Sequence, residues 1–230
     1  GFQFQRGFYS YQTKFAGGLS SFKTNTKRNI VQEDTTFKQA ELDYMNHDVW
    51  MGYALPLKGN SEFFSHRNRL IFSVRYQNER FFQSPFVREN YNYRFHNNQM
   101  VLGKVNFSRE NFYRSSLIYG FGRTEDIPAG DLVGYTFGWQ MAEFFRRFYS
   151  GINYRHGEYL DHFGYLSFEL SAGGFLDGNH LEQGVLSLRT DYISKLFHTE
   201  NLKMRQFFKA NYSLGYNRFP EETLMLERNG

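Results

Sequence analysis

Seven histidines are the side chains of this sequence most able to act as general bases or to bind a metal ion. A hydrolase whose histidine and serine share one strand needs them two residues apart, so that both face the same way, and no His-x-Ser triplet occurs. His156 and Glu158 pair a base with a carboxylate at this spacing, with Asp161 and His162 close by. Because they lie beside an expected turn, we favour a solvated polar loop here over a catalytic or metal site.

A second candidate set is Asp43, His47 and Asp48. A protease above the rim of a barrel would need acidic pairs and a His–Asp couple of this kind, and these are the only residues that resemble one. The sequence therefore predicts no catalytic residue, no metal site and no cofactor, and a protein that is not an enzyme.

Arg123, Glu125 and Asp126 form the most distinctive polar group. One interpretation is a loop that plugs an interior or docks a partner through charge-assisted hydrogen bonds. The other, which we favour, is a turn that Asp126 caps, with Pro128 and Gly130 setting its backbone angles.

Composition excludes several classes of protein. The 230 residues carry a formal charge of +4 and contain no cysteine, which excludes a disulfide framework and thiolate metal sites. No uncharged apolar stretch approaches the about 18–20 residues of a spanning helix. Aromatic residues make up 20% of the chain, which argues against disorder. Basic residues are dispersed and not clustered, so no nucleic-acid partner is expected.

Apolar and polar residues alternate with period two, which is the period of a strand with two different faces. In one stretch Leu70, Phe72, Val74 and Tyr76 alternate with polar residues that include Arg69, Arg75 and Glu79. Such segments predict about ten strands, at about 6–22, 37–57, 66–82, 92–108, 111–122, 131–142, 146–158, 162–174, 183–195 and 204–219. No helical stripe of useful length appears, so we predict an all-β, antiparallel sheet.

Three features favour a transmembrane β-barrel over a soluble sandwich. The pattern persists over the about 9–11 residues of a spanning strand, and clusters such as Phe81-Phe82 and Phe144-Phe145 lie near strand ends, where barrels carry aromatic girdles. The polar faces also carry charges in mid-strand that would suit a barrel lumen. These charges are Arg69, Arg75, Glu79, Lys104, Glu169, Arg189, Asp191 and Lys209.

The segment Tyr119–Gly130, followed by the strand Leu132–Met141, resembles barrel segments of surface-antigen-like outer-membrane proteins of the Bacteroidota. These are related to the superfamily of outer-membrane assembly factors and two-partner-secretion transporters. The run Leu224–Gly230 resembles what precedes the inward-folded loop of that superfamily, although the Arg-Gly-aromatic tripeptide of that loop is not reached. The resemblance implies a larger barrel in a bacterial cell outer membrane, with outer-membrane lipid and other outer-membrane or periplasmic proteins as partners.

We therefore expect residues 1–230 to form a single outer-membrane β-barrel domain, an incomplete segment of a longer protein. The resemblance implies membrane-protein insertion or transport across the outer membrane, by lateral opening or through a gated lumen. Arg123, Glu125, Asp126, Arg69, Arg75 and Glu79 are the candidate lumen and loop residues. The alternatives are a passive or substrate-specific porin, a barrel-borne hydrolase and a soluble all-β binding module.

Overall fold

The computed structural model describes residues 1–10, 12–31, 37–57, 68–89, 91–116, 118, 124–199 and 202–219. Within these residues the fold is all-β, as predicted, apart from one short 3₁₀ turn, η1 (Tyr93–Phe95). The first strands are β1 (Phe2–Arg6), β2 (Phe15–Val31), β3 (Phe37–Pro56), β4 (Asn68–Gln83), β5 (Asn98–Ser116) and β6 (Thr124–Ala142). The others are β7 (Arg146–Leu160), β8 (Gly164–Asp177), β9 (His180–Ser194), β10 (Phe197–His198), β11 (Lys203–Met204) and β12 (Phe207–Tyr216).

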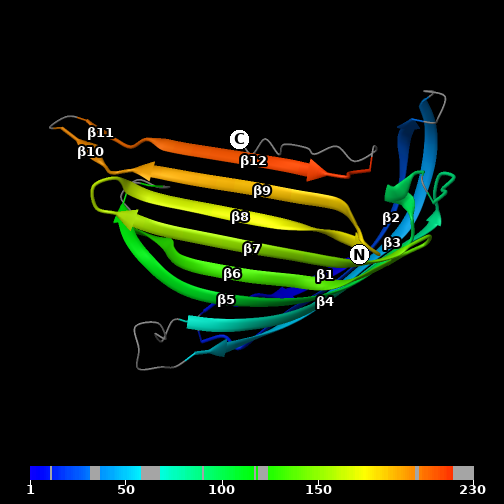
Figure 1. Ribbon diagram of the computed structural model, residues 1–230, viewed down its shortest axis with the longest axis horizontal. Coiled ribbons are helices and arrows are strands. Elements are labelled where there is room, and N and C mark those ends of the chain that lie inside the picture. The colour runs from blue at the N-terminus through cyan, green and yellow to red at the C-terminus, as the bar shows by residue number, and fades with distance from the viewer. Residues whose placement is uncertain are drawn as a thin grey trace.

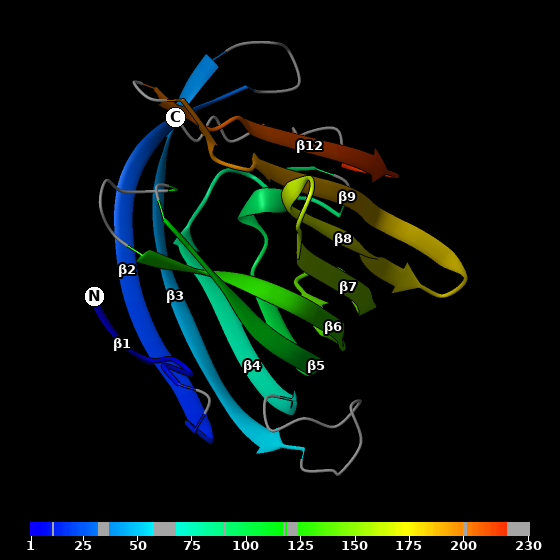
Figure 2. The same ribbon diagram turned by 90° about the vertical axis from the view of Figure 1, so that its left-hand side faces the viewer.

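Ten of these strands form one antiparallel sheet with the order β1-β2-β3-β4-β5-β6-β7-β8-β9-β12 (Figure 1). Each strand therefore pairs with its neighbour in the chain, apart from the small β10–β11 hairpin inserted before β12. The sheet is strongly curved but open, since β1 and β12 are not paired with each other (Figure 2). The predicted antiparallel sheet of about ten strands is confirmed, and within the described residues it is not closed into a barrel.

Several predicted strand boundaries are wrong, since β2 ends at Val31 and β6 begins at Thr124. The turn expected near 108–111 lies inside β5, because the pairing with β6 continues through Arg109↔Asp131 and Asn111↔Ala129 to Ser116↔Thr124. The strands expected at 92–108 and 111–122 are therefore replaced by the single strand β5. Conversely, residues 6–22 are divided between β1 and β2 by a turn, in which Thr13 N donates to Ser10 O (3.1 Å).

The register aligns apolar residues into continuous rows across the sheet. The row through the middle of β4 runs through Phe15, Tyr53, Phe72, Val105, Tyr135, Ile152, Ala172, Leu186 and Leu214. These side chains face outward, and the large ones are exposed: 42% for Phe72 and 55% for Ile152. The apolar face of the sheet is thus its exposed face, the reverse of what water alone would favour.

Four such rows, which cross β4 at Leu70, Phe72, Val74 and Tyr76, form what we call the apolar band. Polar rows border it on both sides. One border contains Ser21, His47, Asn78 and Gln99, and the other contains Arg109, Asp131 and His156. Measured to halfway toward each border row, from residue 69 to residue 77 of β4, the band spans about 26 Å along the strand at about 3.3 Å per residue.

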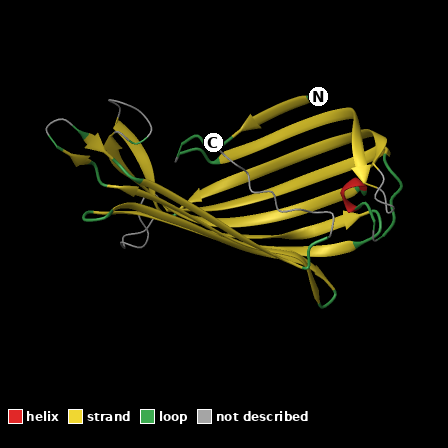
Figure 3. Ribbon diagram, turned by 90° about the horizontal axis from the view of Figure 1, so that it is seen from above, coloured by secondary structure: helices red, strands yellow, loops and turns green. Residues whose placement is uncertain are grey.

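Both ends of the sheet carry chain that lies within its curve. Turn η1, the helix in Figure 3, lies at one end of the sheet, and the tips of β5 and β6 lie at the other (Figure 1). In Figure 2 both lie on the concave side of the sheet. Among the described residues no helix has the length and hydropathy needed to cross a membrane.

Gly130 enables β6 to bend toward the concave side, because its φ of +112° is accessible essentially to glycine. A Cβ at this position would also collide with the carbonyl oxygen of Arg109 on β5. We expect Gly130→Ala to lower the free energy of unfolding by about 1–3 kcal/mol, the cost of a strained backbone, as measured by urea titration of the refolded protein. Gly7→Ala is the control, since a Cβ there has no heavy atom within 4 Å, and equal effects of the two substitutions would contradict this assignment.

Candidate functional site: the polar inner face of the sheet

The positions that alternate with the apolar band form the inner face, which lies on the concave side of the sheet. Register places Arg69, Arg75 and Glu79 of β4 on this face. The other mid-strand charges named from the sequence also lie on it: Lys104, Glu169, Arg189, Asp191 and Lys209. The inner face is therefore polar while the outer face is apolar.

Arg69 is almost completely buried, with 4% of its surface exposed. Its guanidinium binds the Glu110 carboxylate, with 2.8 Å between Nη2 and Oε2, and approaches the carbonyl oxygen of Ser10 at 3.5 Å. The second carboxylate oxygen of Glu110 accepts from the Ser108 hydroxyl (3.2 Å). Arg69 thus holds the β1–β2 connection against β5.

Arg75 binds Asp48 of β3 through a bidentate contact, and Gln77 donates to the same carboxylate (3.2 Å). Two of the three residues considered for a protease site lie on opposite faces of the sheet, because Asp48 faces inward while its neighbour His47 faces outward on the border row. Asp43 pairs with Lys23 at 3.1 Å. The three residues therefore form no common site.

Glu79 is half-buried and lies in register with Asn46 and Asn98 at the end of the inner face. Beyond the apolar band, the extension of the β2–β3 hairpin carries the exposed pair Lys27–Glu41, whose atoms Nζ and Oε1 are 2.6 Å apart. The hydrogen bond and the charge of Lys27 hold the pKa of the Glu41 carboxyl below its usual range. This extension therefore stays charged where the apolar rows have ended.

The polar group of the β5–β6 connection is arranged differently from the predicted turn. Glu125 and Asp126 belong to strand β6, whose ladder with β5 reaches Thr124, whereas Arg123 lies outside the described residues. Glu125 accepts from the backbone N–H of Ile118 (3.1 Å), and Asp126 binds Arg114 on β5 (3.2 Å). Both carboxylates thus stabilise the hairpin, and Pro128 and Gly130 lie within its strand.

The outer half of the β5–β6 hairpin packs across the inner face. Ile118 and Ile127 of the hairpin form a buried cluster with Tyr165 of β8 and Ile193 of β9. The Tyr165 hydroxyl donates to the carbonyl oxygen of Pro128 (2.7 Å). This cluster holds the hairpin over one end of the concave side.

Arg205 ties the same hairpin to the far side of the sheet. It donates to the Ser115 hydroxyl and to the carbonyl oxygens of Ser116 and Ser194, each at 2.9 Å. Ser115 and Ser116 end β5, whereas Ser194 ends β9. Arg205 therefore joins segments that the strand order separates by three strands.

Arg147 organises the opposite end and was not identified from the sequence. Only 2% of its side chain is exposed, and it donates to Gln140 (2.8 Å), Glu182 (2.7 Å) and Gln183 (2.9 Å). Its guanidinium also lies over three aromatic rings, which belong to Phe145, Phe175 and Phe219, at 4.2–5.3 Å from their centroids. The motif Phe144-Phe145-Arg146-Arg147 is the only local signal, and it does not say which arginine is buried.

The β4–β5 connection reaches across this end as well. Tyr93 of η1 stacks on Phe219, which follows β12, with ring centroids 3.5 Å apart. His96 is 3% exposed, and its Nε2 lies 3.0 Å from the carbonyl oxygen of Arg88. The connection is thus anchored within the curve of the sheet, close to the Arg147 cluster.

The histidine candidate of the sequence lies on the outer face. His156 Nδ1 is 2.8 Å from Asp131 Oδ1, and its Nε2 is 3.7 Å from Glu158 Oε2. Asp131 was missed because it becomes a neighbour only through the β6–β7 register. A His–carboxylate pair can orient a general base, but no serine hydroxyl is hydrogen-bonded to His156 among the residues placed by the structure.

Metal binding has no support in the described ranges, where no group of three or more His, Cys, Asp or Glu side chains could hold an ion. Comparison of the chain with protein-family models, with curated proteins and with solved structures finds no match.

Proposed function

We propose that this chain forms the wall of an outer-membrane β-barrel protein of the surface-antigen and assembly–translocation type. Its apolar band contacts lipid, and its polar inner face lines a gated passage used in transport or in membrane-protein insertion. Outer-membrane lipid is the first partner of this surface, and other outer-membrane or periplasmic proteins are the expected clients or accessories. The bacterial outer membrane is the proposed location.

The observation that carries the proposal is the apolar band. Its rows are exposed on every strand from β2 to β9 and on β12, and polar rows end it on both sides. A band about 26 Å long on strands tilted by about 40° would have a height of about 20 Å, against the about 25 Å of barrel proteins. A soluble protein with so large an exposed apolar surface would aggregate.

The open edges of the sheet would need hydrogen-bond partners in lipid, which a closed barrel provides. In hydrocarbon every N–H and C=O needs a partner, which open edges do not provide. The apolar rows continue to both edges, with Phe4 on β1 and Leu214 on β12. We therefore propose that the wall described here belongs to a larger barrel.

A gated lumen is favoured over a permanently open porin, because segments cross the concave side at both ends. The β5–β6 hairpin covers one end and the η1 connection covers the other. The Arg205 contacts hold the hairpin in place. Release of this hairpin is the step that would open the passage.

This mechanism predicts the effect of Arg205→Ala in planar lipid bilayers. Loss of three hydrogen bonds from one guanidinium, at about 0.5–1.5 kcal/mol each, should raise the probability of the open state by about tenfold or more. Arg114→Ala is the matched control, because Arg114 lies on the same hairpin but makes an exposed ion pair. Bilayers that remain without conductance steps at every voltage with both variants would contradict the proposed passage.

A further inference from the structure

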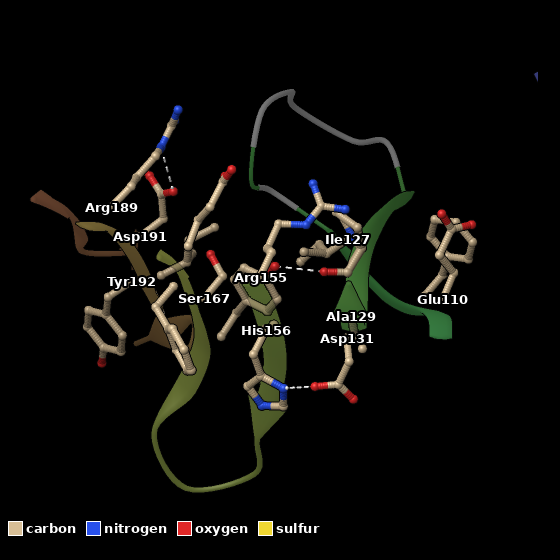
Figure 4. A pocket seen from close by; sticks show the side chains of 18 of the residues that line it. Glu110, Ile127, Ala129, Asp131, Arg155, His156, Ser167, Arg189, Asp191 and Tyr192 are labelled. Carbon is tan, nitrogen blue, oxygen red and sulfur yellow. Dashed lines mark hydrogen bonds and ion pairs between the residues drawn. The ribbon is translucent and has the colours of Figure 1, made fainter. Parts of the chain in front are cut away.

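A cavity of about 680 Å³ lies on the inner face beneath the β5–β6 hairpin (Figure 4). It has an apolar side formed by Ile127 of the hairpin, Tyr165 and Ile193, with Phe207 of β12 at its margin. It is also lined by His156 and by charged residues, which are Arg109, Glu110, Asp131, Arg155, Glu169, Arg189, Asp191 and Lys209. A volume of this size is typical of sites for small molecules, in which a few polar groups orient an apolar body.

The charges of this cavity are only partly neutralised. Arg189 pairs with Asp191 on its own strand, with Nε and Oδ2 3.2 Å apart. Neither Arg155 nor Lys209 has a carboxylate within ion-pairing distance among the residues with a described placement. Four basic and four acidic side chains line the cavity, but three of the carboxylates have partners: Glu110 binds Arg69, Asp131 lies 2.8 Å from His156, and Asp191 binds Arg189. Among the described residues this leaves Glu169 against the unpaired Arg109, Arg155 and Lys209.

Arg155 lies between Leu132 of β6 and Glu169 of β8 in register, and it forms no ion pair with Glu169. The next inner row pairs Gly130 with Gly157. These two glycines contribute no side chain, and the following residue of that row is Ser167, whose hydroxyl lies between Gly157 and Asp191 in register. Figure 4 shows the Arg155 guanidinium extended toward the hairpin and away from the Arg189–Asp191 pair.

We infer that this cavity is a binding site for a small amphiphilic organic anion. Its carboxylate or phosphate would accept charge-assisted hydrogen bonds from Arg155 and attract Lys209. Its apolar or aryl body would lie against Ile127, Tyr165 and Ile193. The inference rests on the geometry of the cavity and does not require the proposed function.

The experiment is isothermal titration of the refolded protein in a non-ionic detergent with three probes. These are 3-phenylpropionate, which has both features, propionate, which lacks the apolar body, and 3-phenylpropylammonium, which reverses the charge. We expect 3-phenylpropionate to bind at least about tenfold more tightly than either of the others, because each charge-assisted hydrogen bond and each buried apolar group contributes on this scale.

Variants distinguish this site from unspecific partitioning into detergent. Arg155→Gln combined with Lys209→Gln should weaken the binding of 3-phenylpropionate about tenfold or more, and Arg155→Glu should shift the preference toward 3-phenylpropylammonium. Lys27→Gln, which removes a positive charge far from the cavity, should bind as the parent does; far-UV circular dichroism checks that each variant is folded. Undetectable binding of 3-phenylpropionate, equal binding of the ammonium probe, or affinity unchanged in the double variant would each overturn the inference.

Discussion

Replacement of Leu214 by arginine is expected to lower the free energy of unfolding in a lipid bilayer by about 2–4 kcal/mol, the cost of a basic side chain near the midplane of a barrel. Leu214 is 52% exposed and lies in the same row as Phe72 and Leu186, inside the apolar band. Urea titration of the protein folded into lipid vesicles, followed by tryptophan fluorescence, measures the change.

The neighbouring substitution Ser213→Arg is the matched control. Ser213 lies on the same strand at nearly the same level, but register pairs it with Ser187 on the inner face. Arginine there meets a polar environment, so we expect a change below about 1 kcal/mol, as for other solvated substitutions. Comparable losses at both positions would show that the two faces of β12 do not differ in their surroundings.

Replacement of Arg147 by alanine is expected to cost about 3 kcal/mol in the free energy of unfolding. Removal of one partner of a buried ion pair costs about 3–5 kcal/mol, and the lower end applies because Glu182 is 30% exposed and can be solvated. Gln140 and Gln183 would each lose a donor as well. The same urea titration reports the loss.

Arg146→Ala provides the comparison, since it removes an identical side chain from the adjacent position. Arg146 lies on the outer border row opposite Met141, and no ion pair of Arg146 occurs within the described part of the chain. A change of about 0.5 kcal/mol or less is expected. If Arg146→Ala were as costly as Arg147→Ala, the buried cluster would not be the source of stability at this end.

The sequence predicted the strands well wherever two faces differ strongly in polarity. The ranges expected at 66–82 and 162–174 match β4 and β8 closely, because alternation fixes both the period and the facing of each residue. It failed at 108–111, where Ser108-Arg109-Glu110-Asn111 has the composition of a turn but pairs as strand. Such residues can extend a polar hairpin because they need not pack against lipid or a core.

For the candidate site, the sequence predicted which face of the sheet each residue lies on, but not which residues it contacts. Alternation identified the inner position of Arg69, Arg75 and Glu79, but not the partners Glu110 and Asp48, which come from other strands. Arg147 and Asp131 were missed for the same reason: their neighbours are set by register and by folded-in loops. The alternation of apolar and polar residues along one strand carries no information about the register between strands or the placement of the loops.

The two tryptophans of the chain can report whether the apolar band contacts lipid. Trp139 lies in the band and is 57% exposed, whereas Trp50 pairs with Gly18 and Arg75 on the inner face. Trp50, Arg75, Leu102 and Gly138 form one row beside Trp139, so both tryptophans lie between the polar borders of the band. The variants Trp50→Phe and Trp139→Phe therefore leave one tryptophan on each face of the sheet.

The measurement is the quenching of each remaining tryptophan by lipids brominated on their acyl chains. We predict strong quenching of Trp139 in the Trp50→Phe variant and weak quenching of Trp50 in the Trp139→Phe variant. Equal quenching of the two, or stronger quenching of Trp50, would show that the apolar band is not the face in contact with lipid.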